Sequence, residues 1–291
     1  MSAQPGILAP VPAAARMLTL QLVPGASAAD LGRALSTLDV DVDLVVGLGA
    51  RLVHLLGLDV APLHELPAIV GPEVAIPSTP ADLWIRASGP DAGQALHRAR
   101  GVLAALGDLV EVVDQTDAFW FDGGRDLTGY EDGTENPTGV DAEAAALHAG
   151  EPGWLVGSSF VAVERWVHHL AVFEAMDRGT QDHTFGRARV SNEELDDAPE
   201  TAHVKRTAQE SFDPDAFVVR RSMPWADARG EGLVFLAFGR DLMAFEALLH
   251  RMVGLEDGLT DALFRFTRPV THAAFWCPPV TGGRLVLGAG G

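Results

Sequence analysis

Two segments in different halves of the chain show the same order of residue types. The first begins at Leu83 and reads LWIRASGPDAGQALHRARGVL, and the second begins at Leu233 and reads LVFLAFGRDLMAFEALLHRMV. Each predicts a short apolar strand, an A-x-G-x-D turn and an amphipathic helix, because glycine suits the turn and Asp91 or Asp241 suits a helix N-cap. Since the order of elements repeats along with the residues, the pattern indicates a duplicated folding unit.

A second, weaker pair of segments extends the repeat. RMLTLQLVPGASAADLGRALSTL, from Arg16, predicts strand, turn and helix, and SSFVAVERWVHHLAVFEAM, from Ser158, predicts strand and helix. Further strands are predicted over residues 42–49, 111–113 and 217–221. Few residues are left for parallel crossovers, so we expect antiparallel sheets with helices on one face, an α+β fold of two ferredoxin-like domains.

A linker rich in glycine, aspartate and glutamate spans residues 123–153, between the two halves. Pro137 and Pro152 interrupt any regular element there. We place the N-terminal domain at residues 1–145, with the GYEDGTENPTG motif of the linker near its end, and the C-terminal domain at residues 146–291. Long loops between sheets are places where binding residues tend to lie.

The composition argues against several classes of protein. A formal net charge of −19 gives a surface that repels nucleic-acid phosphates and anionic lipids, so neither is an expected partner. No apolar run approaches the ~20 residues that a membrane helix needs, and the N-terminal residues lack the basic start of a secretory signal. Cys277 is the only cysteine, so no intrachain disulfide can form, and the cytoplasm is the expected location.

The acidic residue Asp132 lies inside the glycine-rich motif and has two interpretations. Glycine, asparagine and proline around it predict a tight turn that needs no function. Alternatively, Gly129 and Gly133 let the backbone approach a flat ligand, and Asp132 points into a pocket as an acid that moves protons. The second interpretation requires partner residues elsewhere in the chain.

Candidate partners lie in the segment RTAQESFDPDAFVVRRSMPW, from Arg206. On its predicted strand, Arg220 and Ser222 point to one face, where a guanidinium and a hydroxyl could bind a small oxygen species. His203 precedes this segment. The chain has ten histidines but none of the usual zinc-binding spacings, so a metal site built from protein side chains alone is poorly supported. A single axial histidine to haem iron needs no such spacing.

Taken together, these residues resemble the dye-decolourising peroxidases, a family of haem peroxidases. The resemblance rests on the long motif GYEDGTENP, on the HV that begins at His203 and on RRSMP, which ends at Pro224, and it runs from Gln4 to about Val270. The compact length resembles the B-class of the family. The resemblance implies two ferredoxin-like domains packed sheet to sheet, a dimeric α/β-barrel-like arrangement, with one haem b per chain in the C-terminal half.

The resemblance also implies a role for each candidate residue. His203 resembles the axial iron ligand, while Asp132 and Arg220 resemble a pair on the opposite haem face. Ser222 stands where many B-class members have asparagine, which leaves the pocket intact but puts the efficiency of peroxide cleavage in doubt. The resemblance further implies that Gly133 and Thr134 approach the haem edge and that Arg187 meets a haem propionate.

The implied activity is oxidation of dyes and other organic reductants by hydrogen peroxide through a ferryl intermediate. The second ring nitrogen of His203 is expected to have a carboxylate or carbonyl partner. Glu210, Asp213 and Asp215 are near it in sequence, and the sequence does not choose among them. Large dyes cannot enter a closed pocket, so electrons are expected to pass through aromatic side chains, of which Tyr130 lies within the motif.

Two other classes of function stay open at this point. One is a haem-handling or haem-carrier protein with incidental peroxidase activity, which would use the same His203. The other is a binding module without haem, in which Asp132 serves only as a turn residue. The resemblance also implies a homo-oligomer of two to six chains. Packaging in a protein nanocompartment is not expected, because no long extension follows GGRLVLGAGG.

Overall fold

The computed structural model describes residues 1–288 of the chain. Its main sheet has ten strands, and two further sheets are two-stranded hairpins. The first half contributes β1 (Ala14–Leu22), α1 (Ala28–Ser36), β2 (Leu44–Leu48), α2 (Ala50–Leu55), β3 (Ile69–Val70), β4 (Ala75–Ile76), β5 (Leu83–Gly89), α3 (Ala92–Leu106) and β6 (Val110–Phe119).

The second half begins with the linker helix α4 (Gly139–Ala146). It continues with β7 (Ser159–His168), α5 (Leu170–Glu174), α6 (Arg178–Phe185), α7 (His203–Arg206), β8 (Val219–Arg220), β9 (Met223–Asp227), β10 (Gly230–Gly239), α8 (Met243–Met252), β11 (Thr267–Pro269), β12 (Ala273–Cys277), β13 (Val280–Thr281) and β14 (Arg284–Leu285). The domain boundary predicted at residues 145 and 146 falls at the last residue of α4 and stays a prediction.

The order of strands shows the duplication directly. Neighbouring strands in the first half follow the order β2-β5-β1-β6, and the second half has the matching order β9-β10-β7-β12, all antiparallel. This is the strand order of a ferredoxin-like unit in each half. The halves join at two seams, where Leu48 pairs with Trp276 and Ala118 pairs with Trp225. The two sheets therefore close into a barrel, and the predicted fold class is confirmed.

Local sequence explains most of the element boundaries. Asp91 is the N-cap of α3, and its side chain accepts a hydrogen bond from the backbone N–H of Gln94 at 2.9 Å. The matching prediction for Asp241 was wrong by one residue. Leu242 holds the N-cap position of α8, while the Asp241 carboxylate accepts from the Met243 N–H at 2.9 Å. The strand predicted over residues 111–113 is part of the longer β6.

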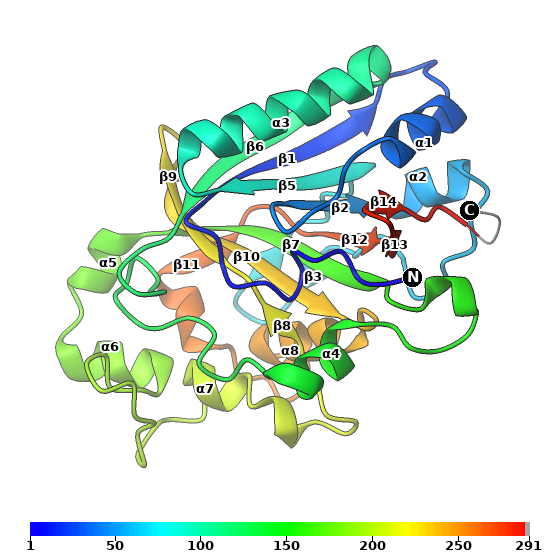
Figure 1. Cartoon of the computed structure of the whole chain (residues 1–291). Helices are drawn as coiled ribbons and strands as arrows, with labels where there is room; N and C mark the ends of the chain where they lie inside the picture. The colour runs from blue at the N-terminus through cyan, green and yellow to red at the C-terminus, as the bar shows by residue number, and fades with distance from the viewer. Residues whose placement is uncertain (289–291) are drawn as a thin grey trace.

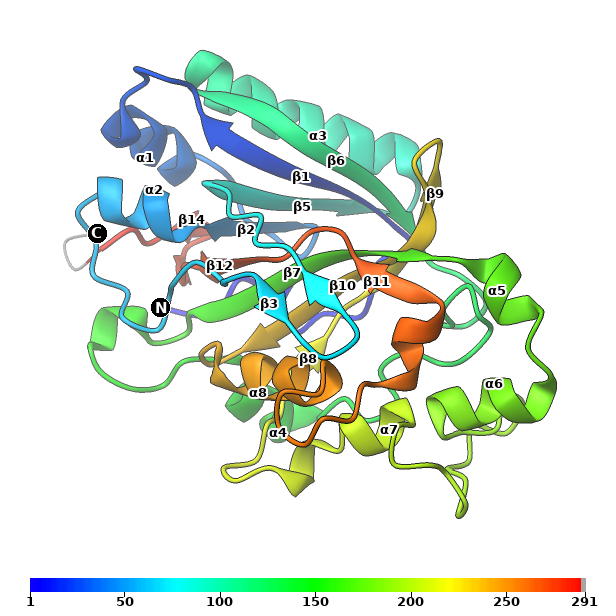
Figure 2. The same ribbon diagram turned by 180° about the vertical axis from the view of Figure 1, so that it is seen from behind.

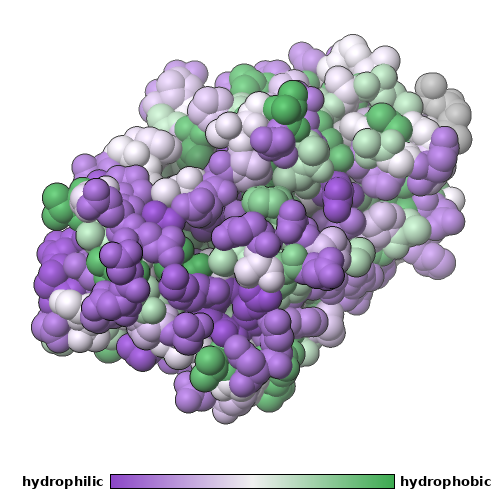
Figure 3. All heavy atoms as spheres, turned by 90° about the horizontal axis from the view of Figure 1, so that it is seen from below, coloured by the Kyte–Doolittle hydropathy of each residue, from purple (hydrophilic) through white to green (hydrophobic). Residues whose placement is uncertain are grey.

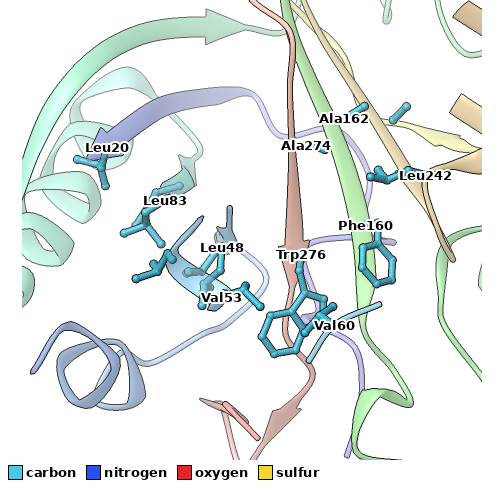
Figure 4. Packing of buried hydrophobic residues seen from close by; sticks show 14 of the residues in the cluster. Leu20, Leu48, Val53, Val60, Leu83, Phe160, Ala162, Leu242, Ala274 and Trp276 are labelled. Carbon is cyan, nitrogen blue, oxygen red and sulfur yellow. The ribbon is translucent and has the colours of Figure 1, made fainter. Parts of the chain in front are cut away.

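Side chains on the central strands alternate between two cores. On β7, Val161 and Val163 belong to an apolar cluster that joins both halves inside the barrel. Phe160 and Ala162 belong to a second cluster on the outer sheet faces, under the helices. Figure 4 shows part of this outer cluster, including Trp276 at one seam of the barrel. The outer face of the second half is the surface on which the cavity described below is built.

The helices of the two halves lie at opposite ends of the molecule. In Figure 1, α1 and α3 lie along the strands of the first half, and α4 and α8 lie against those of the second half, with α7 below them. The view from behind in Figure 2 shows the same separation. Hydrophilic residues predominate on the face seen from below in Figure 3, with hydrophobic ones scattered among them. Within residues 1–288, no helix combines the length and apolar character that a membrane span requires.

Candidate functional site

A cavity of ≈ 320 Å³ lies on the outer face of the second half. Its walls come from the linker loop, from β7 and β10, and from the helices α7 and α8. Apolar side chains form much of the lining, namely Leu233, Phe235, Phe245, Leu248, Leu249, Met252, Leu263 and Phe266. His203, Asp132, Arg220 and Arg187 also line it. A concave apolar site with a few convergent polar groups is typical of cofactor and small-molecule pockets.

His203 is held by a buried carboxylate. The residue begins the four-residue helix α7, and its Nδ1 lies 2.7 Å from Oδ2 of Asp261, which is only 1% exposed. The other oxygen of Asp261 accepts from the Leu263 N–H at 2.8 Å. A carboxylate can only accept hydrogen bonds, so the ring nitrogen that faces Asp261, Nδ1, is the one that carries the proton. In the neutral ring, Nε2 is then left with a lone pair for a ligand in the cavity.

The partner of His203 was not among the predicted candidates. Asp213 and Asp215 line a different surface cleft, and Glu210 is exposed at the edge of the main cavity. The predicted candidates were chosen because they are close to His203 in sequence. Asp261 is distant in sequence and reaches His203 only because the chain returns to α7 after α8. The aspartate has a local role as well, because it caps the turn of 3-10 helix Ala262–Arg265. That cap is the one sequence signal that could have drawn attention to it.

A second contact fixes α7 to the same loop. The Arg206 guanidinium donates to both oxygens of Asp257 at 2.7 Å and to the carbonyl oxygen of Arg251 at 2.7 Å. The hydrogen bonds from Arg206 lower the pKa of Asp257 to about 2. This bidentate pair holds the helix that carries His203 against the loop that carries Asp261.

Replacing Asp257 by asparagine is expected to lower the melting temperature in a way that depends on pH. An unfolded aspartate titrates near ~3.9. Since the folded pKa is depressed, the stabilisation is fully present above about pH 4 and is lost as the pH falls through about 2. The difference in melting temperature between wild type and Asp257→Asn should therefore shrink between pH 5 and pH 2 in thermal scans. Asp59→Asn, which removes an exposed carboxylate, is the control, and an equal trend there would contradict the assignment.

Asp132 and Arg220 meet at another wall of the cavity. Oδ1 of Asp132 lies 3.2 Å from Nη1 of Arg220, and their side chains are 21% and 19% exposed. Asp132 comes from the linker loop, whereas Arg220 ends the short strand β8. Gly133, directly after the acid, has a φ of +78°, a backbone conformation that favours glycine. A carboxylate and a fixed cation thus face the same small space.

A smaller cavity of ≈ 150 Å³ shares the Asp132–Arg220 pair with the main one. Ser222 and Gly133 line this smaller cavity, and the Ser222 hydroxyl oxygen accepts from the Leu236 N–H at 3.4 Å. Thr134 lines neither of the two cavities, and its exposed side chain accepts from Asn192 at 2.9 Å. The structure therefore groups Ser222 and Gly133 with the acid and the cation, in a cavity that His203 does not line.

Arg187 supplies a second cation to the wall of the main cavity. Its Nη1 donates to the carbonyl oxygen of Asn192 at 3.0 Å, and its Nη2 forms an ion pair with the Glu135 carboxylate. The side chain is 16% exposed. A guanidinium in this position can bind the carboxylate of a ligand by exchanging its contact with Glu135.

Sequence reasoning missed two buried histidine–carboxylate pairs next to the site. Nε2 of His168 lies 3.0 Å from Oδ2 of Asp126, and Nδ1 of His272 lies 2.7 Å from Oε1 of Glu164. Burial acts to raise the pKa of Asp126, but hydrogen bonds from His168 and Thr128 outweigh it and the pKa is lowered. These pairs join residues far apart in sequence, so no local spacing could have revealed them.

Tyr130 lies in the same wall, two residues before Asp132. Its ring stacks on Phe185 with centroids 3.9 Å apart, and its hydroxyl donates to the Asp182 carboxylate. Burial, followed by the contact with Asp182, raises the pKa of the Tyr130 phenol well above its usual range. In the described part of the chain, no group of three or more histidine, cysteine, aspartate or glutamate residues could hold a metal ion.

Comparison with known proteins identifies relatives of both halves. Residues 13–120 match the family model described as Dyp-type peroxidase, N-terminal, and residues 123–282 match Dyp-type peroxidase, C-terminal. The chain is 33% identical over 224 residues to the dye-decolorizing peroxidase of Mycobacterium tuberculosis H37Rv, a match that covers 75% of this chain and 67% of that protein. The chain thus spans about two thirds of the length of this curated relative.

Solved structures match over nearly their whole length. A variant of DypB from Rhodococcus jostii RHA1 in complex with heme has a TM-score of 0.88 and 27% sequence identity, covering 96% of both chains. A dye-decolorizing protein from V. cholerae has a TM-score of 0.82 and 27% identity, covering 95% of this chain and 97% of that one.

Proposed function

The chain belongs to the Dyp-type peroxidase family, and on that premise we propose that it is a haem-dependent peroxidase that oxidises dyes and other organic reductants with hydrogen peroxide. The observation that carries the proposal is the composition of the cavity walls. A histidine with a free Nε2 stands on the helical wall, and an aspartate–arginine pair stands on the wall built from the linker loop and β8. This set suits a reaction that needs an iron ligand, a proton carrier and a fixed positive charge.

The residues of the cavity fit a haem group. The lining is mainly apolar, as a porphyrin requires, and Nε2 of His203 would hold the iron while Arg187 would bind a propionate. We propose one haem b per chain, and this group, when bound, would supply the two electrons that reduce hydrogen peroxide, to be replaced afterwards by the organic reductant. The heme complex of the R. jostii relative supports this part of the proposal.

The roles of the chain's own residues follow from their geometry. A carboxylate oxygen of Asp132 takes the proton from the inner oxygen of hydrogen peroxide and returns it to the outer oxygen. The Arg220 guanidinium, 3.2 Å from Asp132, stabilises the negative charge that develops as the O–O bond breaks. The Asp261 carboxylate accepts a hydrogen bond from the Nδ1–H of His203, which fixes the tautomer and makes Nε2 a stronger electron donor.

Finer features of the protein also belong to the proposal. We assign the chain to the B-class because DypB structures match it over 96% of its length. We propose a cytoplasmic location, since the one cysteine, Cys277, is buried and unpaired. We further propose a homo-oligomer of two to six chains, with hydrogen peroxide and a small organic reductant as substrates. We also propose that the Ser222 hydroxyl contributes to the peroxide side of the site and that the backbone of Gly133 and Thr134 would pass near the haem edge. The Thr134 side chain, which lines neither cavity, is given no contact with haem.

Steady-state kinetics test the proposal against a haem carrier. Haem-loaded protein should oxidise an anthraquinone dye with hydrogen peroxide over many turnovers, and faster than the same concentration of free haem. The same sample should transfer its haem slowly to apomyoglobin. Turnover no faster than that of free haem, together with rapid transfer, would support haem carriage and reject the peroxidase.

A further inference from the structure

The side chain of Asn136 is bonded to the backbone of Arg220 at two points. Its Oδ1 accepts from the Arg220 N–H at 2.7 Å, and its Nδ2 donates to the Arg220 carbonyl oxygen at 3.0 Å. The other edge of β8 pairs with β10, where Arg220 lies opposite Ala237. The amide of Asn136 therefore occupies the place that a neighbouring strand would take on the second edge of β8.

Asn136 belongs to the same turn as the acid, Asp132. Its backbone N–H donates to the carbonyl oxygen of Gly133 at 3.0 Å, which closes the turn. A Cβ on Gly133 would lie 2.6 Å from Nδ2 of Asn136, so the amide packs directly over the glycine. This contact, together with the φ of +78°, explains why a glycine stands there. The turn thus places the acid and the Asn136 amide in a fixed relation.

A second carboxamide connects the same two segments. Gln209, 5% exposed, donates from Nε2 to the Glu135 carbonyl oxygen at 3.0 Å, and its Oε1 accepts from the Val218 N–H at 3.0 Å. The Arg220 carbonyl oxygen also accepts from Nη1 of Arg221 at 3.0 Å. The linker turn and β8 come from distant parts of the chain, and these side chains fix them relative to each other.

We propose that Asn136 is a positioning residue that sets the distance between Asp132 and Arg220. It holds the backbone of Arg220 while its own turn carries Asp132, so the separation of the carboxylate and the guanidinium depends on its two hydrogen bonds. This inference rests on the proposed peroxidase function. Without these two hydrogen bonds, the second edge of β8 has no partner at Arg220, and the guanidinium is held less firmly against the acid. Catalysis by pre-organised charge is sensitive to such loss of position.

Two substitutions distinguish the contributions of the two hydrogen bonds between the Asn136 side chain and the Arg220 backbone. Asn136→Ala removes both, and Asn136→Asp keeps an acceptor for the Arg220 N–H but cannot donate to its carbonyl oxygen. For Asn136→Ala we expect about tenfold slower reaction of the haem-loaded protein with peroxide in stopped-flow measurements. We expect an intermediate rate for Asn136→Asp. Haem affinity and the KM for dye should stay within about twofold of wild type, because His203 and the cavity lining are unchanged.

Two readouts report the position of Arg220 without turnover. We expect fluoride bound to the ferric protein to accept a hydrogen bond from the Arg220 guanidinium, so the affinity for fluoride should fall in Asn136→Ala. Amide hydrogen exchange of a peptide containing Arg220 should become faster. Val102→Ala, which removes buried volume beneath α3 in the other half, is the control for general destabilisation. It should change neither readout.

The results distinguish failure of this inference from failure of the proposed function. Asn136→Ala with unchanged exchange at Arg220, or with faster exchange but a peroxide rate within twofold of wild type, would overturn the positioning role. An equal loss of rate in Val102→Ala would overturn it as well. A wild-type protein that binds haem but does not react with peroxide would instead reject the proposed function, and fluoride affinity and exchange would still decide whether Asn136 positions Arg220.

Discussion

Replacing His203 by glycine is expected to remove nitrogen coordination from the haem iron and to lower peroxide-driven dye oxidation about a thousandfold, or about 4 kcal/mol of transition-state stabilisation. The effect is large because His203 combines two properties that no other residue of the cavity shares. Its Nε2 lone pair is free for iron, and its Nδ1 proton is held by the buried Asp261 at 2.7 Å. Steady-state kinetics and electron paramagnetic resonance of the ferric protein measure the two losses.

Added imidazole should rescue the His203→Gly variant, and a second histidine variant serves as the control. Added imidazole should enter the space left by the side chain in His203→Gly and restore the spectrum of nitrogen-ligated iron. His183→Gly removes a histidine that is 43% exposed and bonded to Asp197, outside the cavity, and should leave the spectrum unchanged. Nitrogen ligation that persists in His203→Gly without imidazole would show that another residue binds the iron.

Removing either member of the Asp132–Arg220 pair is expected to slow the reaction with peroxide by at least ~10-fold and up to ~1,000-fold. Asp132→Ala removes the proton carrier, and Arg220→Ala removes the charge that stabilises the departing oxygen. Stopped-flow mixing with peroxide measures this step separately from dye oxidation. Haem binding through His203 should persist in both variants, because the His203 ring is hydrogen-bonded to Asp261 and to neither of these side chains.

The double variant gives a further test of the pair. Since the two side chains are 3.2 Å apart, the combined loss in Asp132→Ala/Arg220→Ala should be smaller than the sum of the single losses in free energy. Arg33→Ala and Asp141→Ala remove the same residue types at exposed positions and serve as controls. If neither single variant slows the reaction tenfold, the roles given to this pair are wrong.

The two halves of the fold were predictable because their signals are local. Asp91 caps α3 with its own side chain, and period-two alternation on β7 separates residues such as Phe160 and Val161 between two cores. Closure of the barrel depends instead on single pairings, Leu48 with Trp276 and Ala118 with Trp225. Such seams follow from the packing of whole sheets. The resemblance to a known family predicted the barrel-like arrangement, which the periodicity of the sequence could not predict.

The site was predictable to the extent that its residues lie in motifs. Asp132, Arg220 and His203 stand in distinctive stretches, and the structure brings them to one cavity. The contacts that orient them are not visible in the same way. Asp261 reaches His203 across 58 positions of sequence, and Asn136 reaches Arg220 across 84. An aspartate or an asparagine in a loop has many local uses, so its sequence position alone does not show what it holds.

Titration of the haem-free protein with haem, followed by absorption spectroscopy, tests the central assignment most directly. We expect the Soret band to saturate at one haem per chain, with the spectrum of a histidine-ligated ferric haem that changes on addition of peroxide. The same titration of His203→Gly should give a different spectrum. Absence of saturable binding by the wild type, or an identical spectrum from the two proteins, would contradict the assignment of this cavity as a haem site ligated by His203.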